Sequence, residues 1–139
     1  MYIDLHLLVV NDSPTLRHVI VSLLKELGYV KISEAADGAM ALRTFKAAKN
    51  MAVPIHFVVT DCSMPIMDGL TLIRSIRDTP ALSELPILMI TAVATEENIL
   101  AAAKAGADGY VVKPLGANAL KKRINSILKK REMNDYMTP

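Results

Sequence analysis

Short apolar runs alternate with amphipathic stretches five times along this chain. The apolar runs cover residues 5–10, 30–34, 55–60, 87–90 and 109–112, and a stretch with helical spacing of its apolar positions follows each of them. Strict alternation of strand and helix is typical of a parallel sheet with right-handed crossovers and helices on both faces. The pattern therefore predicts an α/β, doubly wound fold with a five-stranded parallel sheet and five helices.

We expect the predicted strands to differ in how far they are buried. Residues 5–10, 55–60 and 87–90 are continuously apolar, as in strands that are covered on both faces. Residues 30–34 alternate between apolar and polar side chains, so this strand either has one wet face or lies at a sheet edge.

Residues typical of helix ends mark the helical stretches. Ser13, Asp68 and Thr95 are expected as N-caps, because their side-chain oxygens can accept from free backbone N–H groups. Gly28 and Gly106 are expected just past helix ends. The first helix should bury an apolar stripe made of Leu16, Val19, Ile20, Leu23, Leu24 and Leu27.

Length and composition indicate one globular domain. The chain has 139 residues, 52% of them apolar, and a net charge of +2 that favours no class of partner. We expect the domain to cover residues 1–131 and to leave a short tail at 132–139. The single cysteine, Cys62, excludes an internal disulfide and fits a reducing compartment. With neither a signal peptide nor an apolar run long enough to cross a bilayer, a soluble cytoplasmic protein without membrane contact is expected.

Four polar residues end apolar runs and carry the candidate chemistry. Asp12, Asp61, Thr91 and Lys113 follow or close four of the five predicted strands. The carboxyl ends of parallel strands share one rim, where open α/β sheets bind their ligands. Two close carboxylates repel each other unless a cation lies between them, and Mg²⁺ prefers oxygen ligands of this kind. These residues therefore predict a site for Mg²⁺ and a phosphoryl group.

Asp61, Lys113 and Thr91 would each have a distinct role in such a site. Asp61 would be the nucleophile and would form an acyl phosphate. Lys113 would place a positive charge on one phosphoryl oxygen, and Thr91 would donate a hydroxyl hydrogen bond to another.

Several motifs resemble those of the receiver domains of bacterial two-component response regulators, and most of all the stand-alone chemotaxis receivers. The resemblance covers roughly residues 5–130 and is carried by these segments: Leu23–Gly28, Met64-Pro65, Met67-Asp68-Gly69, Glu97-Asn98-Ile99, Ala105-Gly106-Ala107 and Gly109–Pro114. It implies a flavodoxin-like sheet with strand order 2-1-3-4-5.

The resemblance also implies residue roles. Asp61 matches the phosphoacceptor and a Mg²⁺ ligand, Asp12 matches the second carboxylate ligand, and Ser63 lies where the family uses a backbone carbonyl on the metal. Thr91 and Lys113 match the residues that contact the phosphoryl group.

Two further positions have matches in the family. Tyr110 matches the aromatic residue that changes position together with the hydroxyl residue Thr91, and Lys113-Pro114 matches a cis peptide bond. One position departs from the family, because two acids usually follow the first strand and this chain has Asn11-Asp12. Asn11 can accept a hydrogen bond from a metal-bound water but lacks the charge, so weaker Mg²⁺ binding is expected.

The resemblance implies a phosphoacceptor in a signalling pathway rather than an enzyme. A histidine kinase would donate the phosphoryl group, and a protein such as a flagellar motor switch would be the target. We expect a monomer that binds no nucleic acid. The basic runs 121–123 and 129–131 are read as a solvated face, or as a contact surface for an acidic partner.

Other functions stay open at this level. A degenerate receiver that binds partners without phosphorylation is the first alternative, with Asn11 as its evidence, and a phosphorelay intermediate is another. A haloacid-dehalogenase-type phosphohydrolase needs a second acid at the position of Ser63. A flavodoxin needs a phosphate-binding loop where Asp12 lies.

Overall fold

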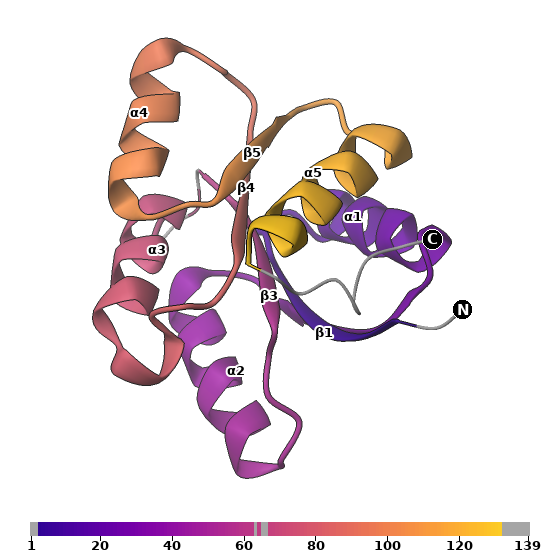
Figure 1. Ribbon diagram of the computed structural model, residues 1–139, viewed down its shortest axis with the longest axis vertical. Coiled ribbons are helices and arrows are strands. Elements are labelled where there is room, and N and C mark those ends of the chain that lie inside the picture. The colour runs from indigo at the N-terminus through magenta and orange to yellow at the C-terminus, as the bar shows by residue number, and fades with distance from the viewer. Residues whose placement is uncertain (1–2, 63, 65–66, 132–139) are drawn as a thin grey trace.

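A five-stranded parallel sheet lies between two layers of helices in the computed structural model of the chain (Figure 1). The structure describes residues 3–62, 64 and 67–131. Its elements, in chain order, are β1 (Ile3–Val10), α1 (Pro14–Glu26), β2 (Tyr29–Ala35), α2 (Gly38–Asn50), β3 (Phe57–Asp61), α3 (Gly69–Asp78), the 3-10 helix η1 (Pro80–Leu82), β4 (Ile87–Thr91), α4 (Glu96–Ala105), β5 (Gly109–Val112) and α5 (Ala117–Lys130).

The strand order is β2-β1-β3-β4-β5, and every neighbouring pair is parallel. Val10 of β1 pairs with Thr60 of β3, and Thr91 of β4 pairs with Val112 of β5. The carboxyl ends of β1, β3, β4 and β5 are therefore gathered at one rim of the sheet. The α/β class, the strand order and the five helices are confirmed.

Two apolar clusters, one on each face of the sheet, form the core. On one face, α1 and α5 pack against the strands through Ile20, Leu24, Leu120 and Ile124. On the other face lie α2, α3 and α4, with Phe45, Leu72, Ile73 and Ala102 among the buried residues. Figure 1 shows these two layers on opposite sides of the strands. Each described residue of β3 and β4 is buried, as their continuous apolar runs predict.

The edge position of β2 is confirmed, and one expectation for α1 is wrong. Val30 and Lys31 of β2 are exposed at the sheet edge. On α1, Ile20 and Leu24 are buried as expected, but the side chain of Val19 is 41% exposed and Val21 is buried instead. The stripe that α1 buries is therefore shifted toward Val21, while Leu16, Leu23 and Leu27 still pack against the core on this face.

The predicted helix ends agree with the structure. The side chains of Ser13, Asp68 and Thr95 accept hydrogen bonds from backbone N–H groups in the first turns of α1, α3 and α4. Gly28 and Gly106 follow α1 and α4 with positive φ angles of 101° and 112°, which glycine adopts without strain. Among the described residues, none of the helices is long and apolar enough to cross a membrane.

Candidate functional site

Asp61 is the last residue of β3, and three donors surround its carboxylate. Its Oδ1 accepts from the backbone N–H of Cys62 at 2.8 Å. Its Oδ2 accepts from Lys113 Nζ at 3.2 Å and from Asn11 Nδ2 at 3.3 Å. The residue is only 5% exposed, so the carboxylate is fixed in orientation while one edge remains open to the rim. Lys113, from the end of β5, is thus brought to Asp61 across 52 residues of sequence.

Gly69 allows the first turn of α3 to lie directly against the end of β3. Its N–H donates to the carbonyl of Cys62 at 3.0 Å. A Cβ atom at this position would lie 2.1 Å from the backbone oxygen of Asp61, a separation that no side chain tolerates. This close approach explains why glycine follows Met67-Asp68, and it fixes the backbone that carries the candidate nucleophile.

Asn11 is fully buried, and all four of its polar groups are hydrogen-bonded. Its N–H donates to Ala35, its carbonyl accepts from Arg17 Nη1 at 2.7 Å, and its Oδ1 accepts from the N–H of Ser13 at 2.9 Å. The remaining group, Nδ2, donates to Asp61. Because Ser13 offers a donor and Asp61 an acceptor, the amide can adopt only this orientation. The structure therefore shows Asn11 as a donor to the carboxylate, a contact that the sequence did not predict.

Asp12 lies at the same rim, two residues beyond the end of β1, and is exposed. With Asp61 it offers carboxylate oxygens from neighbouring strands, which is the donor type that Mg²⁺ takes while keeping several waters. Among the described residues, no group of three or more His, Cys, Asp and Glu side chains is arranged to bind a metal. The two carboxylates fit a cation that is also coordinated by water and substrate. Ser63, the third predicted ligand, lies outside the described residues.

Thr91 ends β4 and is 4% exposed. Its hydroxyl donates to the carbonyl of Val93 at 3.1 Å and accepts from the N–H of the same residue at 3.2 Å. The Thr91 carbonyl also accepts from the N–H of Lys113 at 2.9 Å. Thr91 and Lys113 are therefore neighbours at the rim. The Lys113–Pro114 bond is cis, as the resemblance implied.

Arg17 and Cys62 lie near the site, and they contribute to it in different ways: Arg17 holds the backbone of Asn11, and Cys62 supplies a backbone N–H. Arg17 of α1 donates to the Asn11 carbonyl and, through Nε, to Glu34 Oε1 at 3.0 Å; no local motif in the sequence indicates this contact. Burial, and then the neighbouring Asp61 carboxylate, raise the pKa of the Cys62 thiol. A protonated thiol is a poor nucleophile, so Cys62 contributes its backbone N–H to the site rather than its sulfur.

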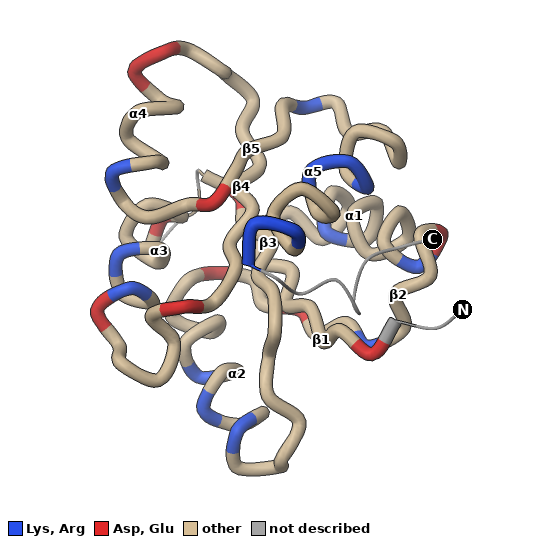
Figure 2. The backbone as a smooth tube through the Cα atoms, in the orientation of Figure 1, with Lys and Arg blue, Asp and Glu red and all other residues tan. Residues whose placement is uncertain are grey.

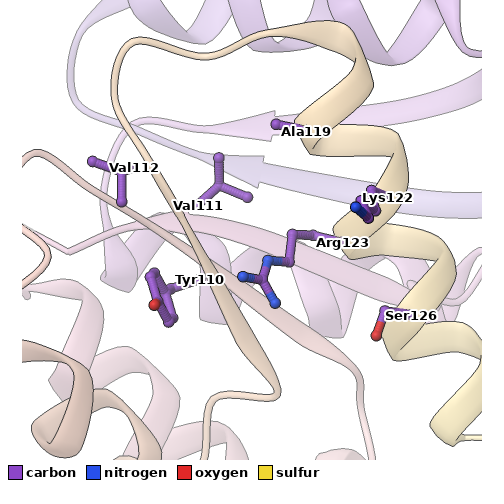
Figure 3. A pocket seen from close by; sticks show the side chains of 7 residues that line it. All are labelled: Tyr110, Val111, Val112, Ala119, Lys122, Arg123 and Ser126. Carbon is purple, nitrogen blue, oxygen red and sulfur yellow. The ribbon is translucent and has the colours of Figure 1, made fainter.

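Tyr110 lies on β5, beside a hollow of about 590 Å³ between β5 and α5 (Figure 3). The guanidinium of Arg123 lies 5.4 Å from the centroid of the Tyr110 ring. The basic residues of α5 are the blue segments of this helix in the backbone trace of Figure 2. Lys122 and Arg123 line the hollow, so at least part of the first basic run contributes to a concave surface.

Comparison with known proteins decides the family. Residues 7–125 match the model of the response regulator receiver domain. The chain belongs to the response regulator receiver domain family. It is 41% identical over 127 residues to chemotaxis protein CheY-3 of Vibrio cholerae, an alignment that covers 91% of this chain and 94% of that protein.

Solved receiver structures have the same fold. Chemotaxis protein CheY4 of Vibrio cholerae superposes with a TM-score of 0.80 at 29% identity, covering 89% of this chain and 98% of that one. A CheX–CheY–BeF3–Mg²⁺ complex from Borrelia burgdorferi gives a TM-score of 0.80 at 27% identity and covers 89% of each chain. CheY-like receivers are signalling proteins rather than enzymes, they bind Mg²⁺ at their active sites, and they act with histidine kinases.

Proposed function

We propose that this receiver accepts a phosphoryl group from a histidine kinase on Asp61 and then signals by binding a protein target, in chemotaxis. The observation that carries the proposal is the Asp61 carboxylate, buried at the rim with Lys113 Nζ at 3.2 Å and with Asp12 in the loop that follows the neighbouring strand β1. The relationship to chemotaxis receivers supports the pathway and a cytoplasmic site of action.

In the proposed reaction, a carboxylate oxygen of Asp61 attacks the phosphorus of a phosphohistidine. The P–N bond breaks, the imidazole leaves and takes up a proton, and an acyl phosphate forms on Asp61. Bound Mg²⁺, held by Asp12 and Asp61, would neutralise charge on the transferring group. Lys113 orients Asp61 before transfer and contacts a phosphoryl oxygen after it, since its Nζ lies within hydrogen-bond distance of the nucleophile.

Thr91 would couple phosphorylation of Asp61 to a conformational change in the rest of the domain. Its hydroxyl must leave Val93 to donate to a phosphoryl oxygen, because it now uses both its proton and a lone pair on that residue. The acyl phosphate would carry about two negative charges where the carboxylate carried one, and its phosphoryl oxygens are strong acceptors for such a hydroxyl. Tyr110, on the neighbouring strand, would shift with Thr91 and alter the surface formed by α4, β5 and α5.

Labelling by acetyl phosphate tests the proposal. We expect Mg²⁺-dependent incorporation of one phosphoryl group into the wild type, none into Asp61→Asn, and wild-type labelling of Asp4→Asn, which removes an exposed carboxylate at the start of β1. Absence of labelling in the wild type would favour the degenerate receiver, which the neutral Asn11 supports. Transfer onward from Asp61 to a histidine phosphotransfer protein would instead favour a phosphorelay role.

A further inference from the structure

Tyr110 and Arg123 belong to opposite layers of the domain. Tyr110 packs against the apolar cluster beneath α2, α3 and α4. Arg123 is on α5, whose buried residues Leu120 and Ile124 belong to the cluster on the other face. Because β5 is an edge strand, the Arg123 side chain can pass around the edge of the sheet and reach the Tyr110 ring (Figure 3).

The contact between them has the geometry of a cation–π interaction. Arg123 Cζ lies 5.4 Å from the ring centroid, within the range of about 6 Å at which a guanidinium is attracted to an aromatic face. Tyr110 is half-buried and Arg123 is exposed, and the guanidinium lies over the ring.

The same two residues are shared by two hollows. The first, of about 590 Å³, lies between β5 and α5 and includes Val112 and Lys122 in its wall. The second, of about 210 Å³, lies beside α4 and includes Ile99 and Ala103. Tyr110 and Arg123 line both hollows, so the pair lies between them.

The pair is also close to the phosphorylation site along the sheet. Tyr110 pairs with Met89 of β4, and Thr91 lies two residues further along the same strand, opposite Val112. A change at Thr91 therefore reaches Tyr110 through a single pair of strands.

We propose that Arg123 is a positioning residue that stabilises Tyr110 in its resting place and so opposes the switch. This inference rests on the proposed function, because the switch is driven from Asp61. In this proposal, the shift of Tyr110 that follows phosphorylation takes the ring away from the guanidinium. By linkage, removal of Arg123 then strengthens binding of a phosphoryl analogue at Asp61.

The test uses beryllofluoride with saturating Mg²⁺ as the phosphoryl analogue. Arg123→Ala should bind beryllofluoride about two- to fivefold more tightly than the wild type. This ratio of affinities corresponds to the free energy of an exposed cation–π interaction. Without ligand, NMR signals of the Tyr110 ring, assigned with Tyr110→Phe, should move toward their beryllofluoride-bound positions. Arg123→Lys, which keeps the charge, should restore part of both effects.

Lys122→Ala is the matched control, because it removes a neighbouring charge that lines the same hollow but has no described contact with the ring. It should change neither readout. Unchanged Tyr110 ring signals in Arg123→Ala, or unchanged or weaker beryllofluoride affinity, would overturn the inference. Failure of the wild type to bind beryllofluoride at all would instead count against the proposed function. In that case, Tyr110 ring signals that differ between free wild type and free Arg123→Ala would still support a positioning role for Arg123, and identical signals would overturn it.

Discussion

At the scale of single residues, Asn11 is where this chain departs from the usual two-acid receiver site. Its amide donates to the Asp61 carboxylate at 3.3 Å, and its side-chain oxygen already accepts from Ser13. An aspartate at this position would offer oxygens and a negative charge to a cation, whereas the amide offers its NH2 group to a carboxylate that a cation also needs. We therefore expect Asn11 to orient Asp61 and to contribute little to metal affinity.

Asn11→Asp should consequently tighten Mg²⁺ binding, by about tenfold if the change is comparable to other substitutions next to metal ligands. Isothermal titration with Mg²⁺ measures the effect. Asn50→Asp, at the exposed last residue of α2, makes the same change in net charge at the opposite rim of the sheet and serves as the control. Equal affinity in Asn11→Asp and the wild type would contradict the role assigned to the amide.

At the scale of elements, the loop between β1 and α1 is fixed from the helix side. Arg17 is 19% exposed, and it donates to the carbonyl of Asn11 and to Glu34 of β2. It thereby joins α1, β2 and the loop that carries Asp12. A charge-assisted hydrogen bond to a buried carbonyl contributes more than an exposed ion pair, since the carbonyl has no water to replace the donor.

Arg17→Ala should lower the free energy of unfolding by about 1–2 kcal/mol. The control is Lys31→Ala, whose ion pair with Asp4 spans 3.7 Å between side chains that are 57% and 80% exposed, and which should change stability by less than about 0.5 kcal/mol. Urea denaturation of both variants measures the difference. Equal stabilities would show that Arg17 is dispensable to the loop.

A second element-scale feature is a pair of histidines where β1 meets the segment before β3. His56 Nδ1 accepts from the backbone N–H of His6 at 3.0 Å, and the His6 ring contacts Ser33 Oγ at 2.7 Å. Burial lowers the pKa of His56, and the charges of His6 and Lys31 lower it further. Protonation of Nδ1 would remove the hydrogen bond from His6.

The sign of the pH dependence follows from the lowered pKa of His56. Below the ordinary histidine pKa of about 6.5, the unfolded chain takes up a proton before the folded one, so stability falls with decreasing pH until the folded-state pKa is passed. Unfolding experiments between pH 5 and pH 7 should show a smaller loss of stability on acidification in His56→Gln than in the wild type.

At the scale of the whole molecule, Asp108 connects elements at the rim opposite the site. Its Oδ2 accepts from Arg77 of α3 at 3.0 Å and from the N–H of Ile87 at the start of β4 at 2.7 Å. Its Oδ1 accepts from Arg131, which follows α5, at 2.6 Å. The carboxylate is 17% exposed and is balanced by both guanidinium groups.

Asp108→Asn should lower the free energy of unfolding by about 2 kcal/mol, because it leaves two half-buried arginines without their shared acid. Asp4→Asn, which alters an acid that is 80% exposed, is the control and should be nearly neutral. Chemical denaturation of both variants measures their free energies of unfolding relative to the wild type. A neutral Asp108→Asn would mean that backbone carbonyls alone satisfy Arg77, which also donates to Gly106, Ser83 and Leu85.

Particular residues show how far the sequence alone predicts this molecule. The caps Ser13, Asp68 and Thr95 act within one turn of their own position, and the structure confirms them. Val19 was expected in the core and is exposed, since burial depends on what covers a helix and not on its own pattern alone. The contacts of Arg17, Asn11 and Asp108 join segments far apart in the chain and leave no local signal.

The sequence by itself determined the alternation of strands and helices, the fold class and the candidate residues Asp12, Asp61, Thr91 and Lys113, because periodicity and strand-end chemistry are local properties. Only the tertiary structure decided the distances among these residues, the orientation of the Asn11 amide and the contact of Arg123 with Tyr110. These depend on strand register and on how the helices pack across the sheet, which no single segment specifies.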